Sequence, residues 1–571
     1  MIQALFFHYR DVIKDRVGDE HGNLIAVDVP REESFGDFST NIALLLAKKI
    51  GRKPLDIAEE LCGQLKSHAD FTDISVKAPG FINWRIPANV LRQHCIVMFD
   101  RNFGRINLGN GRNVNLEYVS ANPTGPLHAG HARAAVSGDV LANLLSFVGY
   151  NVTREYYIND AGNQVEILAK SLHYRYLELF LEQKSSLPDW AYPGEYLIDT
   201  AQKIKEKHGD AFVGKCESEW LAFFKAFAVD DMMNCIKADL LDLGIHHDVF
   251  SSELEFINCG AVEKALEFLE NNKLIYRGVL AVPKGKEPDD WEEREQLLFR
   301  STIFGDDVDR PLQKSDGSWT YFATDVAYHM DKITRGFDEI INFWGADHGG
   351  YVKRLQSAVA ALSCGRKKLD VKLVQMVRFM QNGKEMKMSK RAGTFVTVRD
   401  VLDSVGKDVI RYIMLTRRDD APLDFDFQRV VEQNRDNPVF YVQYAYARTH
   451  SVLKQFAAVF QKPVPSVTEV NLSLLDSEPE LNLLKTLSDW PRQVFMAAKN
   501  REPHRLTFYL AELASRFHFL WNQGKDNAML RFVLANDFEK TAARMILLRA
   551  MQNIIESAFH IIGITAIEEL R

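Results

Sequence analysis

The segment from Asn113 to Gly149 constrains the fold of this chain more than any other stretch. Apolar residues at positions 114, 116 and 118 alternate with other residues, which is typical of a strand, and Asn-Pro-Thr-Gly-Pro at 122–126 ends it. A helix is predicted to begin near His128. Its apolar face recurs every four residues, at Ala132, Val136, Val140 and Leu144. The segment therefore predicts a strand, a tight loop and a helix that packs on a sheet.

Two histidines stand at the start of this predicted helix. His128 and His131 are three residues apart, so both imidazoles project from the same helix end. Free backbone amides and the positive end of the helix dipole attract phosphate there. A structural histidine pair is the alternative, and a metal-binding pair is a weaker one. A second motif, Lys-Met-Ser-Lys at 387–390 on a glycine-flanked loop, favours the phosphate interpretation.

The two motifs together resemble a known pair of signatures. His128-Ala129-Gly130-His131 and the lysine motif at 387–390 look like the HIGH and KMSK signatures of class I aminoacyl-tRNA synthetases. The surrounding sequence ANPTGPLHAGHARAA is similar to the version in arginyl-tRNA synthetases, and the resemblance covers nearly the whole chain. It implies a ligase that uses ATP to convert L-arginine to arginyl-adenylate. The arginine then passes to the 3′ end of tRNA(Arg), at the 2′ hydroxyl, with AMP and pyrophosphate released.

The length of 571 residues exceeds what one hydrophobic core supports, and about three or four units are expected. The patterns predict a small α/β domain at 1–108, a Rossmann-like, doubly wound parallel-sheet domain at 109–420 and a helix bundle at 421–571. The resemblance identifies these as the N-terminal additional tRNA-contacting domain, the catalytic domain with an insertion and the lysine loop, and the anticodon-binding domain. The D-A-L-R signature of the family appears as Asp408-Val409-Ile410-Arg411, with two interior residues changed but still apolar.

The composition is that of a globular protein and not of a disordered, disulfide-rich or membrane-spanning one. Hydrophobic residues make up 46% and charged residues 26%, as in ordinary globular proteins, and the net charge of -7 gives no global basic footprint for RNA. Any tRNA contact must therefore use local Lys and Arg patches. Six cysteines lack a C-x-x-C pair, which argues against a zinc knuckle or a disulfide framework and fits a reducing cytoplasm. No signal peptide or membrane-length apolar run is visible.

Substrate choice is expected to depend on acidic groups, because a guanidinium needs a carboxylate partner. Tyr321 and Asp325 are four residues apart on one predicted helix face, and a strand-like segment at 246–256 contains Glu253. Asp347 and His348 follow a buried-strand run that stops at Gly345, at the edge where such sheets bind ligands. For each acid the alternative is a surface carboxylate or a helix cap.

The resemblance carries roles onto these positions. It implies that His128 and His131 stabilise the α-phosphate, and that Lys387 and Lys390 hold the departing pyrophosphate. Arginine would be bound by Asn122, Glu253, Tyr321 and Asp325. ATP would be bound by Gly125, Pro126, Leu127, His128, Gly130, His131, Gly345, Asp347, His348, Met388 and Ser389. ATP implies Mg²⁺, but no carboxylate cluster declares a dedicated metal site, and neither zinc nor a prosthetic group is expected.

Other interpretations stay open at this stage. A class I synthetase for another amino acid, or a small-molecule adenylate-forming enzyme, would use the same chemistry, although the long helical C-terminal region argues against the latter. A catalytically silent RNA-binding protein would have no reason to keep both motifs. In the helical region, Tyr441, Tyr444 and Tyr446 are candidates for base stacking or for ordinary packing. A monomer is expected from the resemblance alone.

Overall fold

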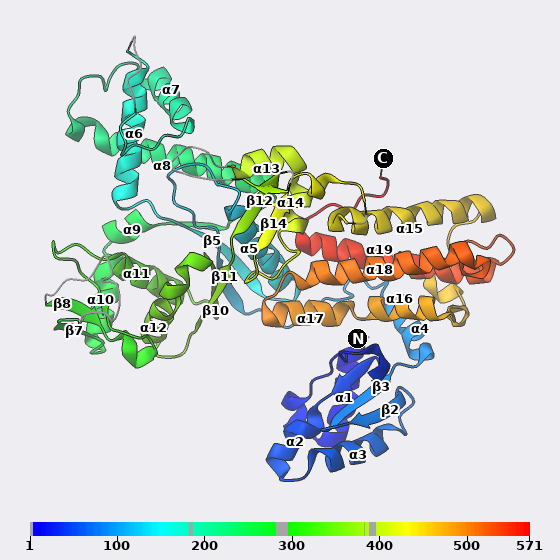
Figure 1. Ribbon diagram of the computed structural model, residues 1–571. Coiled ribbons are helices and arrows are strands. Elements are labelled where there is room, and N and C mark those ends of the chain that lie inside the picture. Colours follow the sequence, from blue (N-terminus) through cyan, green and yellow to red (C-terminus); the bar gives the residue numbers. More distant parts are fainter. Residues whose placement is uncertain are drawn as a thin grey trace. The chain divides into compact units, whose positions relative to one another are not determined.

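The computed structural model describes residues 4–181, 187–280, 295–381, 383–386, 396–434 and 436–570 (Figure 1). The chain forms two compact units. One consists of Met1–Ile106, Gln433–Ile561 and Thr565–Arg571, and the other consists of Asn107–Glu432 and Ile562–Ile564. None of the described helices combines the length and the apolar character that crossing a membrane requires.

A five-stranded parallel sheet organises the second unit (Figure 1). Its order is β11-β10-β4-β5-β6, made of β4 (Asn113–Glu117), β5 (Asn151–Ile158), β6 (Val249–Ser252), β10 (Glu339–Gly345) and β11 (Leu369–Val374). The chain starts at the central strand β4, runs outward through β5 and β6, and then crosses to the other side through β10 and β11. Val114, Leu116 and Ile341 are completely buried, as expected for a parallel sheet covered on both faces. This is the doubly wound arrangement that the sequence predicted.

Strand β4 leads into the predicted loop and then into helix α5 (His131–Phe147). The predicted apolar face is buried, with Ala132, Val136, Val140 and Leu144 all in the core. The helix begins at His131, so the prediction that it begins near His128 was wrong by one turn. Residues 127–129 instead pair with residues 396–398, through two backbone hydrogen bonds of 2.8 Å. This extended pairing prevents the three residues from joining the helix.

Helices fill the connections of the sheet. Between β5 and β6 lie α6 (Asn163–Glu178), α7 (Tyr196–His208) and α8 (Glu217–Asp242). Between β6 and β10 lie α9 (Glu253–Asn258), α10 (Ala261–Asn271), the small sheet β7 (Ile275–Gly278), β8 (Gln296–Phe299) and β9 (Arg310–Pro311), and α11 (Tyr321–Thr334). Helix α12 (Val352–Leu362) connects β10 to β11.

Glu253 opens a helix and does not lie in a strand. The predicted strand at 246–256 ends at Ser252, where β6 stops. The Ser252 hydroxyl then accepts a hydrogen bond from the Glu255 N–H (3.1 Å) and caps α9. A serine followed by acidic residues is a helix-start signal, and here it outweighs the β-propensity of the preceding residues.

A second three-stranded sheet follows β11, with β12 (Val377–Gln381) between β13 (Lys384–Glu385) and β14 (Leu423–Asp426). Strands β12 and β13 pair antiparallel on either side of Gly383, whose φ of +72° suits a tight turn. Helices α13 (Val398–Val405) and α14 (Lys407–Ile413) come next. The lysine motif, Lys387 to Lys390, lies outside the described residues.

The first unit contains the small α/β domain. Strands β1 (Phe38–Thr40), β2 (Thr72–Lys77) and β3 (Phe81–Arg85) form an antiparallel sheet in the order β1-β3-β2. Helices α1 (Leu5–Val17), α2 (Ile42–Ile50), α3 (Pro54–Leu65) and α4 (Ala88–Val97) accompany it. Its core includes Tyr9, Ile42, Ile82 and Trp84, all completely buried.

The same unit contains the helical region, with α15 (Pro438–Phe460), α16 (Glu478–Ser488), α17 (Trp490–Asn500), α18 (Arg505–Asp526) and α19 (Phe538–Ile562). The all-helical prediction is confirmed. Tyr446 is buried and donates a hydrogen bond to the Glu556 carboxylate (2.6 Å), so packing and not base stacking describes it. Tyr441 and Tyr444 both lie against the His518 ring.

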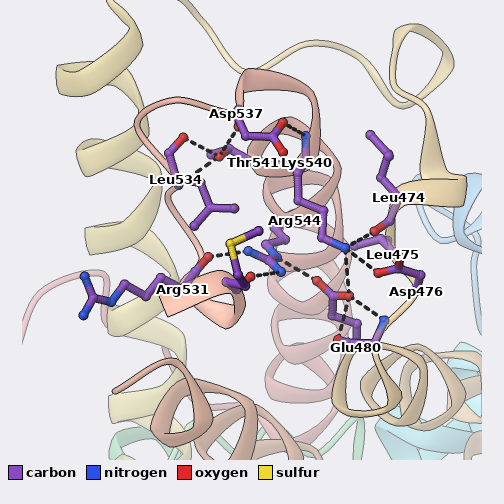
Figure 2. A network of polar contacts seen from close by, with 12 residues as sticks. Leu474, Leu475, Asp476, Glu480, Arg531, Leu534, Asp537, Lys540, Thr541 and Arg544 are labelled. Carbon is purple, nitrogen blue, oxygen red and sulfur yellow. Dashed lines mark hydrogen bonds and ion pairs between the residues drawn. The ribbon is translucent and has the colours of Figure 1, made fainter. Parts of the chain in front are cut away.

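A buried polar network fixes the end of the helical region (Figure 2). Arg544 and Glu480 form an ion pair of 2.6 Å, and both side chains are almost completely inaccessible. The Arg544 guanidinium also donates to the carbonyls of Met529 (2.7 Å) and Arg531 (2.5 Å), in the segment before α19. Lys540 adds a contact of 2.5 Å to Asp476 (Figure 2). Because each nitrogen of the buried guanidinium has an acceptor, the network holds α16, α19 and their connecting segments in one arrangement.

Candidate active site

The point where the chain reverses direction in the sheet lies between β4 and β10. Strand β4 is followed by a connection toward β5, and the neighbouring β10 by a connection toward β11 on the other side. In doubly wound sheets, the carboxyl ends of two such strands border a crevice that binds ligands. The loop with His128 follows β4, and the residues from Gly345 to His348 follow β10. The topology therefore brings both predicted nucleotide-binding segments to the same edge.

The two histidine rings stack on each other at this edge. Their centroids are 3.7 Å apart with an interplanar angle of 21°. Gly130 makes this possible, because a Cβ atom there would lie 2.9 Å from the His128 ring. Gly125 is constrained in the same way by the Tyr196 hydroxyl, which donates to the Thr124 carbonyl (2.6 Å). A side chain at position 130 would therefore displace the His128 ring, and one at position 125 would crowd Tyr196.

A buried arginine orients the helix that carries His131. Arg133 on α5 is completely buried, and burial lowers the pKa of its guanidinium. It donates to the carbonyls of Ala421 (2.7 Å) and Arg418 (2.6 Å). One turn later, Ser137 donates to the Asp419 carboxylate (2.8 Å). The segment 418–421 thereby anchors the N-terminal half of α5.

Further along α5, Asp139 forms an ion pair of 2.5 Å with Arg411, and both side chains are at most 4% exposed. The Arg411 guanidinium also donates to the carbonyls of Leu243 (3.0 Å) and Ile562 (2.7 Å). Arg411 is the arginine of the signature Asp408 to Arg411, and Ile410 beside it is completely buried. The apolar replacement at that position therefore serves packing, as the sequence suggested.

A cluster of acidic side chains, called the acidic pocket below, gathers where β4, β5 and β6 end: Glu117, Asp160, Glu253 and Asp325. Glu253 at the start of α9 is 3% exposed, and burial, together with Asp325 and Asp160, raises its pKa to about 8. Burial also raises the pKa of Asp325 to about 7, although the Tyr351 hydroxyl donates a hydrogen bond of 2.5 Å to its carboxylate. Asp325 is therefore close enough to Glu253 to raise the cost of ionising Glu253. The structure thus brings two of the predicted arginine-binding acids together.

The polar surroundings of this pocket include residues that the sequence did not reveal. Glu117, the last residue of β4, forms an ion pair of 2.6 Å with Lys332, and the Lys332 side chain is completely buried. Lys332 also donates to the Asn342 side chain (3.2 Å). Lys332 follows Glu117 by 215 residues, so no local pattern announces the pair.

Other predicted site residues lie at the rim. Tyr321 is the first residue of α11 and 57% exposed, and its hydroxyl lies 3.2 Å from where a Cβ atom on Gly162 would be. Asn122 is exposed and donates to the Gln164 side chain (2.9 Å). Asp347 and His348 are exposed and 3.5 Å apart. Leu127 is buried, so any contact with a nucleotide there would use its backbone.

Backbone strain marks the turn between β4 and the histidine loop. Val119 has a φ of +71° and Ser120 a φ of +40°, in the left-handed region. For a β-branched valine this conformation is a genuine outlier, and such strain is concentrated at functional sites. In this conformation the Ser120 hydroxyl contacts both β4 and β5, because it donates to the Glu117 carboxylate (3.2 Å) and accepts from the Tyr157 N–H (3.0 Å).

Comparisons with known proteins agree with this geometry along the whole chain. Three family profiles match: the arginyl tRNA synthetase N terminal domain at residues 8–86, the catalytic domain of class I (R) tRNA synthetases at 94–434, and the DALR anticodon binding domain at 442–570. The arginine–tRNA ligases of Roseobacter denitrificans and Ruegeria pomeroyi are each 52% identical over 550 residues, which cover 96% of this chain and 94% of each relative. The solved arginyl-tRNA synthetase of Thermus thermophilus has the same fold, with a TM-score of 0.76 at 19% identity, covering 99% of this chain and 100% of that one.

A parallel sheet with this switch point, joined to a catalytic profile that spans more than half of the sequence, is that of a class I aminoacyl-tRNA synthetase. The relatives that are 52% identical over nearly the full length are arginine–tRNA ligases, so the amino acid is arginine. The chain belongs to the arginyl-tRNA synthetase family. Its reaction is that of an arginine–tRNA ligase: it activates L-arginine with ATP and transfers it to the 3′ end of tRNA(Arg), releasing AMP and pyrophosphate.

Proposed function

We propose that the crevice between β4 and β10 carries out the activation of arginine, and that the acidic pocket at Glu253 and Asp325 reads the guanidinium. The observation that carries this proposal is the pair of buried carboxyl groups with raised pKa values. A buried carboxyl that holds a proton in the empty pocket becomes a strong partner once a cation enters. An arginine side chain supplies that cation in a planar form that two carboxylates bind.

At the phosphate end, His128 and His131 stabilise charge on the α-phosphate as the arginine carboxylate attacks it. The N-terminus of α5, a helix of 17 residues, adds the positive end of its dipole. Phosphoryl chemistry of this kind depends on positioning and electrostatics, and needs no covalent bond to the protein. The stacked geometry of the two rings supports this role.

Lys387 and Lys390 hold the β- and γ-phosphates of the departing pyrophosphate. They lie outside the described residues, but the residues on either side of that segment support the assignment. The Met386 N–H donates to the Phe379 carbonyl (2.8 Å), and the Val396 carbonyl accepts from the Ala129 N–H (2.8 Å), immediately after His128. The residue before the lysine segment, Met386, is therefore hydrogen-bonded to β12, and the residue after it, Val396, is hydrogen-bonded to the histidine loop.

ATP binding is assigned to the two loops that border the crevice. The residues are Gly125, Pro126, Leu127, His128, Gly130 and His131 from the first, Gly345, Asp347 and His348 from the second, and Met388 and Ser389 from the lysine motif. Mg²⁺ would accompany ATP and neutralise its phosphate charge. Among the described residues no group of three His, Cys, Asp or Glu side chains is arranged to hold a metal, so the triphosphate itself would supply most of the ligands. Neither zinc nor a prosthetic group is proposed.

For the amino acid, Asn122 at the rim binds the backbone end of arginine, and Tyr321 assists Asp325 at the side chain. The acyl group is then passed to the 2′ hydroxyl of the terminal ribose. We assign residues 1–108 to tRNA contact, 109–420 to catalysis and 421–571 to anticodon binding, in a monomeric, cytoplasmic enzyme. The three matching profiles support this division of labour.

Asp325→Asn tests the proposed pocket. The variant keeps the size of the side chain but removes the charge, so the KM for arginine should rise on the order of 100-fold, while the KM for ATP stays within about twofold. Asp331→Asn on the same helix is the matched control, because Asp331 pairs with Arg335 at the surface and should leave both constants unchanged. An unchanged KM for arginine in the Asp325 variant would remove this residue from the pocket.

A further inference from the structure

Tyr157 occupies the end of β5, between the loop that follows β4 and the corner where β6 becomes α9. Its ring lies against Tyr328 of α11, with centroids 4.5 Å apart. Its N–H is held by the Ser120 hydroxyl (3.0 Å) in the strained turn described above. Both the backbone and the ring of Tyr157 are therefore held by neighbouring groups.

The Tyr157 hydroxyl is inaccessible and has no hydrogen-bond partner among the described residues. Nearly all buried hydroxyl groups in proteins are hydrogen-bonded, because leaving one without a partner destabilises the folded state. The Oε2 atom of Glu253, in the same pocket, is likewise buried without a partner. These two atoms, on the neighbouring elements β5 and α9, are acceptors that a ligand with several N–H groups would satisfy.

The charges around the hydroxyl specify that ligand. The β5–β6 register places Tyr157 beside Ser251, two residues before Glu253, and burial first, and then Asp325, Glu253, Glu117 and Asp160, raise the pKa of Tyr157 above its ordinary value. The buried cation of the region, Lys332, is already paired with Glu117 and Asn342. A pocket with this excess of acceptors fits a cationic ligand that has several N–H groups.

The corner that holds Glu253 is itself braced. The Asp160 carboxylate accepts hydrogen bonds from the Ser252 hydroxyl (2.6 Å) and from the Leu254 N–H (2.9 Å), on either side of Glu253. The chain on either side of Glu253 is therefore held in position. Pre-positioned acceptors of this kind are what a specific site requires.

We propose that Tyr157 determines specificity for arginine, because its hydroxyl and the Glu253 Oε2 atom receive N–H groups of the substrate's guanidinium. The inference rests on the arginine pocket proposed above and adds to it a residue from β5. A guanidinium has five N–H donors in one plane and reaches separate acceptors at once. An ammonium has three donors at one point, and a urea side chain such as that of citrulline turns a carbonyl oxygen toward the acids. Tyr157 therefore favours a guanidinium over an ammonium, while the acids disfavour the urea carbonyl.

The test is Tyr157→Phe, which removes one oxygen atom and leaves the ring. In the ligand-free enzyme the variant loses no hydrogen bond, so its melting temperature should stay equal or rise. The KM for arginine in the charging reaction should nevertheless rise about 10-fold, with kcat and the KM for ATP nearly unchanged. An equal or higher melting temperature together with a higher KM for arginine is a result that a tyrosine with only a structural role cannot produce.

Tyr176→Phe is the matched control, because the Tyr176 hydroxyl donates to the Gly209 carbonyl (2.7 Å), away from the pocket. This control should lower the melting temperature and leave the KM for arginine unchanged. An unchanged KM for arginine in Tyr157→Phe, or a melting temperature that falls as in the control, would overturn the inference. Asp325→Asn separates the two proposals: if only that variant affects arginine the pocket stands without Tyr157, and if neither does the pocket itself is wrong.

Discussion

Glu253 and Asp325 are the residues whose chemistry departs furthest from that of ordinary surface acids. Both are held in a pocket that is too poor in water to favour two negative charges, which is why their pKa values rise to about 8 and about 7. The groups that face them come from several elements: Glu117, Tyr157 and Asp160 around the strand ends, and Tyr351, Arg354 and Lys332 from the helices. Both carboxyl groups therefore bind protons at a higher pH than surface acids do.

This titration predicts a pH dependence of arginine binding. The guanidinium stays protonated, so the two carboxyl groups must lose their protons to pair with it. Binding should release protons, and the affinity for arginine should increase as the pH rises from about 6 to about 8, above which it levels off. Calorimetric titration with arginine in two buffers of different ionisation enthalpy measures the proton release directly. An affinity that does not change over this range would mean that the acids are already ionised.

The sequence revealed part of this pocket and missed the rest for a physical reason. Asp325 and Tyr321 stand at helical spacing within one segment, so a local pattern exposes them. Tyr157 gives no such signal, because its neighbour Tyr156 is an identical residue on the opposite face of β5, and the acids around it come from elements up to 168 residues away along the chain. Only the strand order brings them together.

At the scale of elements, helix α5 links the histidine loop of the proposed active site to the rest of the second unit. Its first residue is His131, its first two turns are anchored through Arg133 and Ser137, and its middle is anchored through Asp139. The apolar period of this helix was predictable, since it needs only a local pattern. Its start was not, because the pairing of residues 127–129 with 396–398 joins segments nearly 270 residues apart.

Arg411→Met should destabilise the enzyme strongly. The change removes the nearer of the two cations beside the buried Asp139 carboxylate and leaves Arg154 at 3.9 Å, and removing one partner of a buried ion pair costs about 3–5 kcal/mol. Denaturant unfolding followed by fluorescence measures the free energy of unfolding. Arg378→Met is the control, because its ion pair with Asp424 is about half exposed on both sides and its loss should cost less than about 1 kcal/mol. Equal effects of the two changes would show that Arg411 has no anchoring role.

At the scale of the whole molecule, the division into an α/β domain, a doubly wound catalytic sheet and a helical region followed from pattern and length. The reason is that each kind of periodicity is local and persists over many residues. Helices α16 and α17 show a limit of local periodicity. The helical apolar pattern over 478–499 does not stop at Asp489, so it predicts one helix. Pro491 cannot donate a backbone hydrogen bond, however, and the chain begins a new helix at Trp490.

The net charge of -7 makes no whole-molecule case for or against RNA, so tRNA binding must depend on particular surfaces. The same chain contains both the catalytic domain for arginine activation and a helical domain of the anticodon-binding family. The central claim is that this joined enzyme reads a guanidinium and delivers it to tRNA.

The most direct test is the attachment of labelled amino acids, one at a time, to total tRNA in the presence of ATP and Mg²⁺. The acidic pocket predicts that arginine alone is attached, because only its side chain matches Glu253 and Asp325 in charge and shape. Lysine and citrulline are the informative competitors, since each lacks one of those two properties. Attachment of either at a rate comparable to that of arginine would contradict the account.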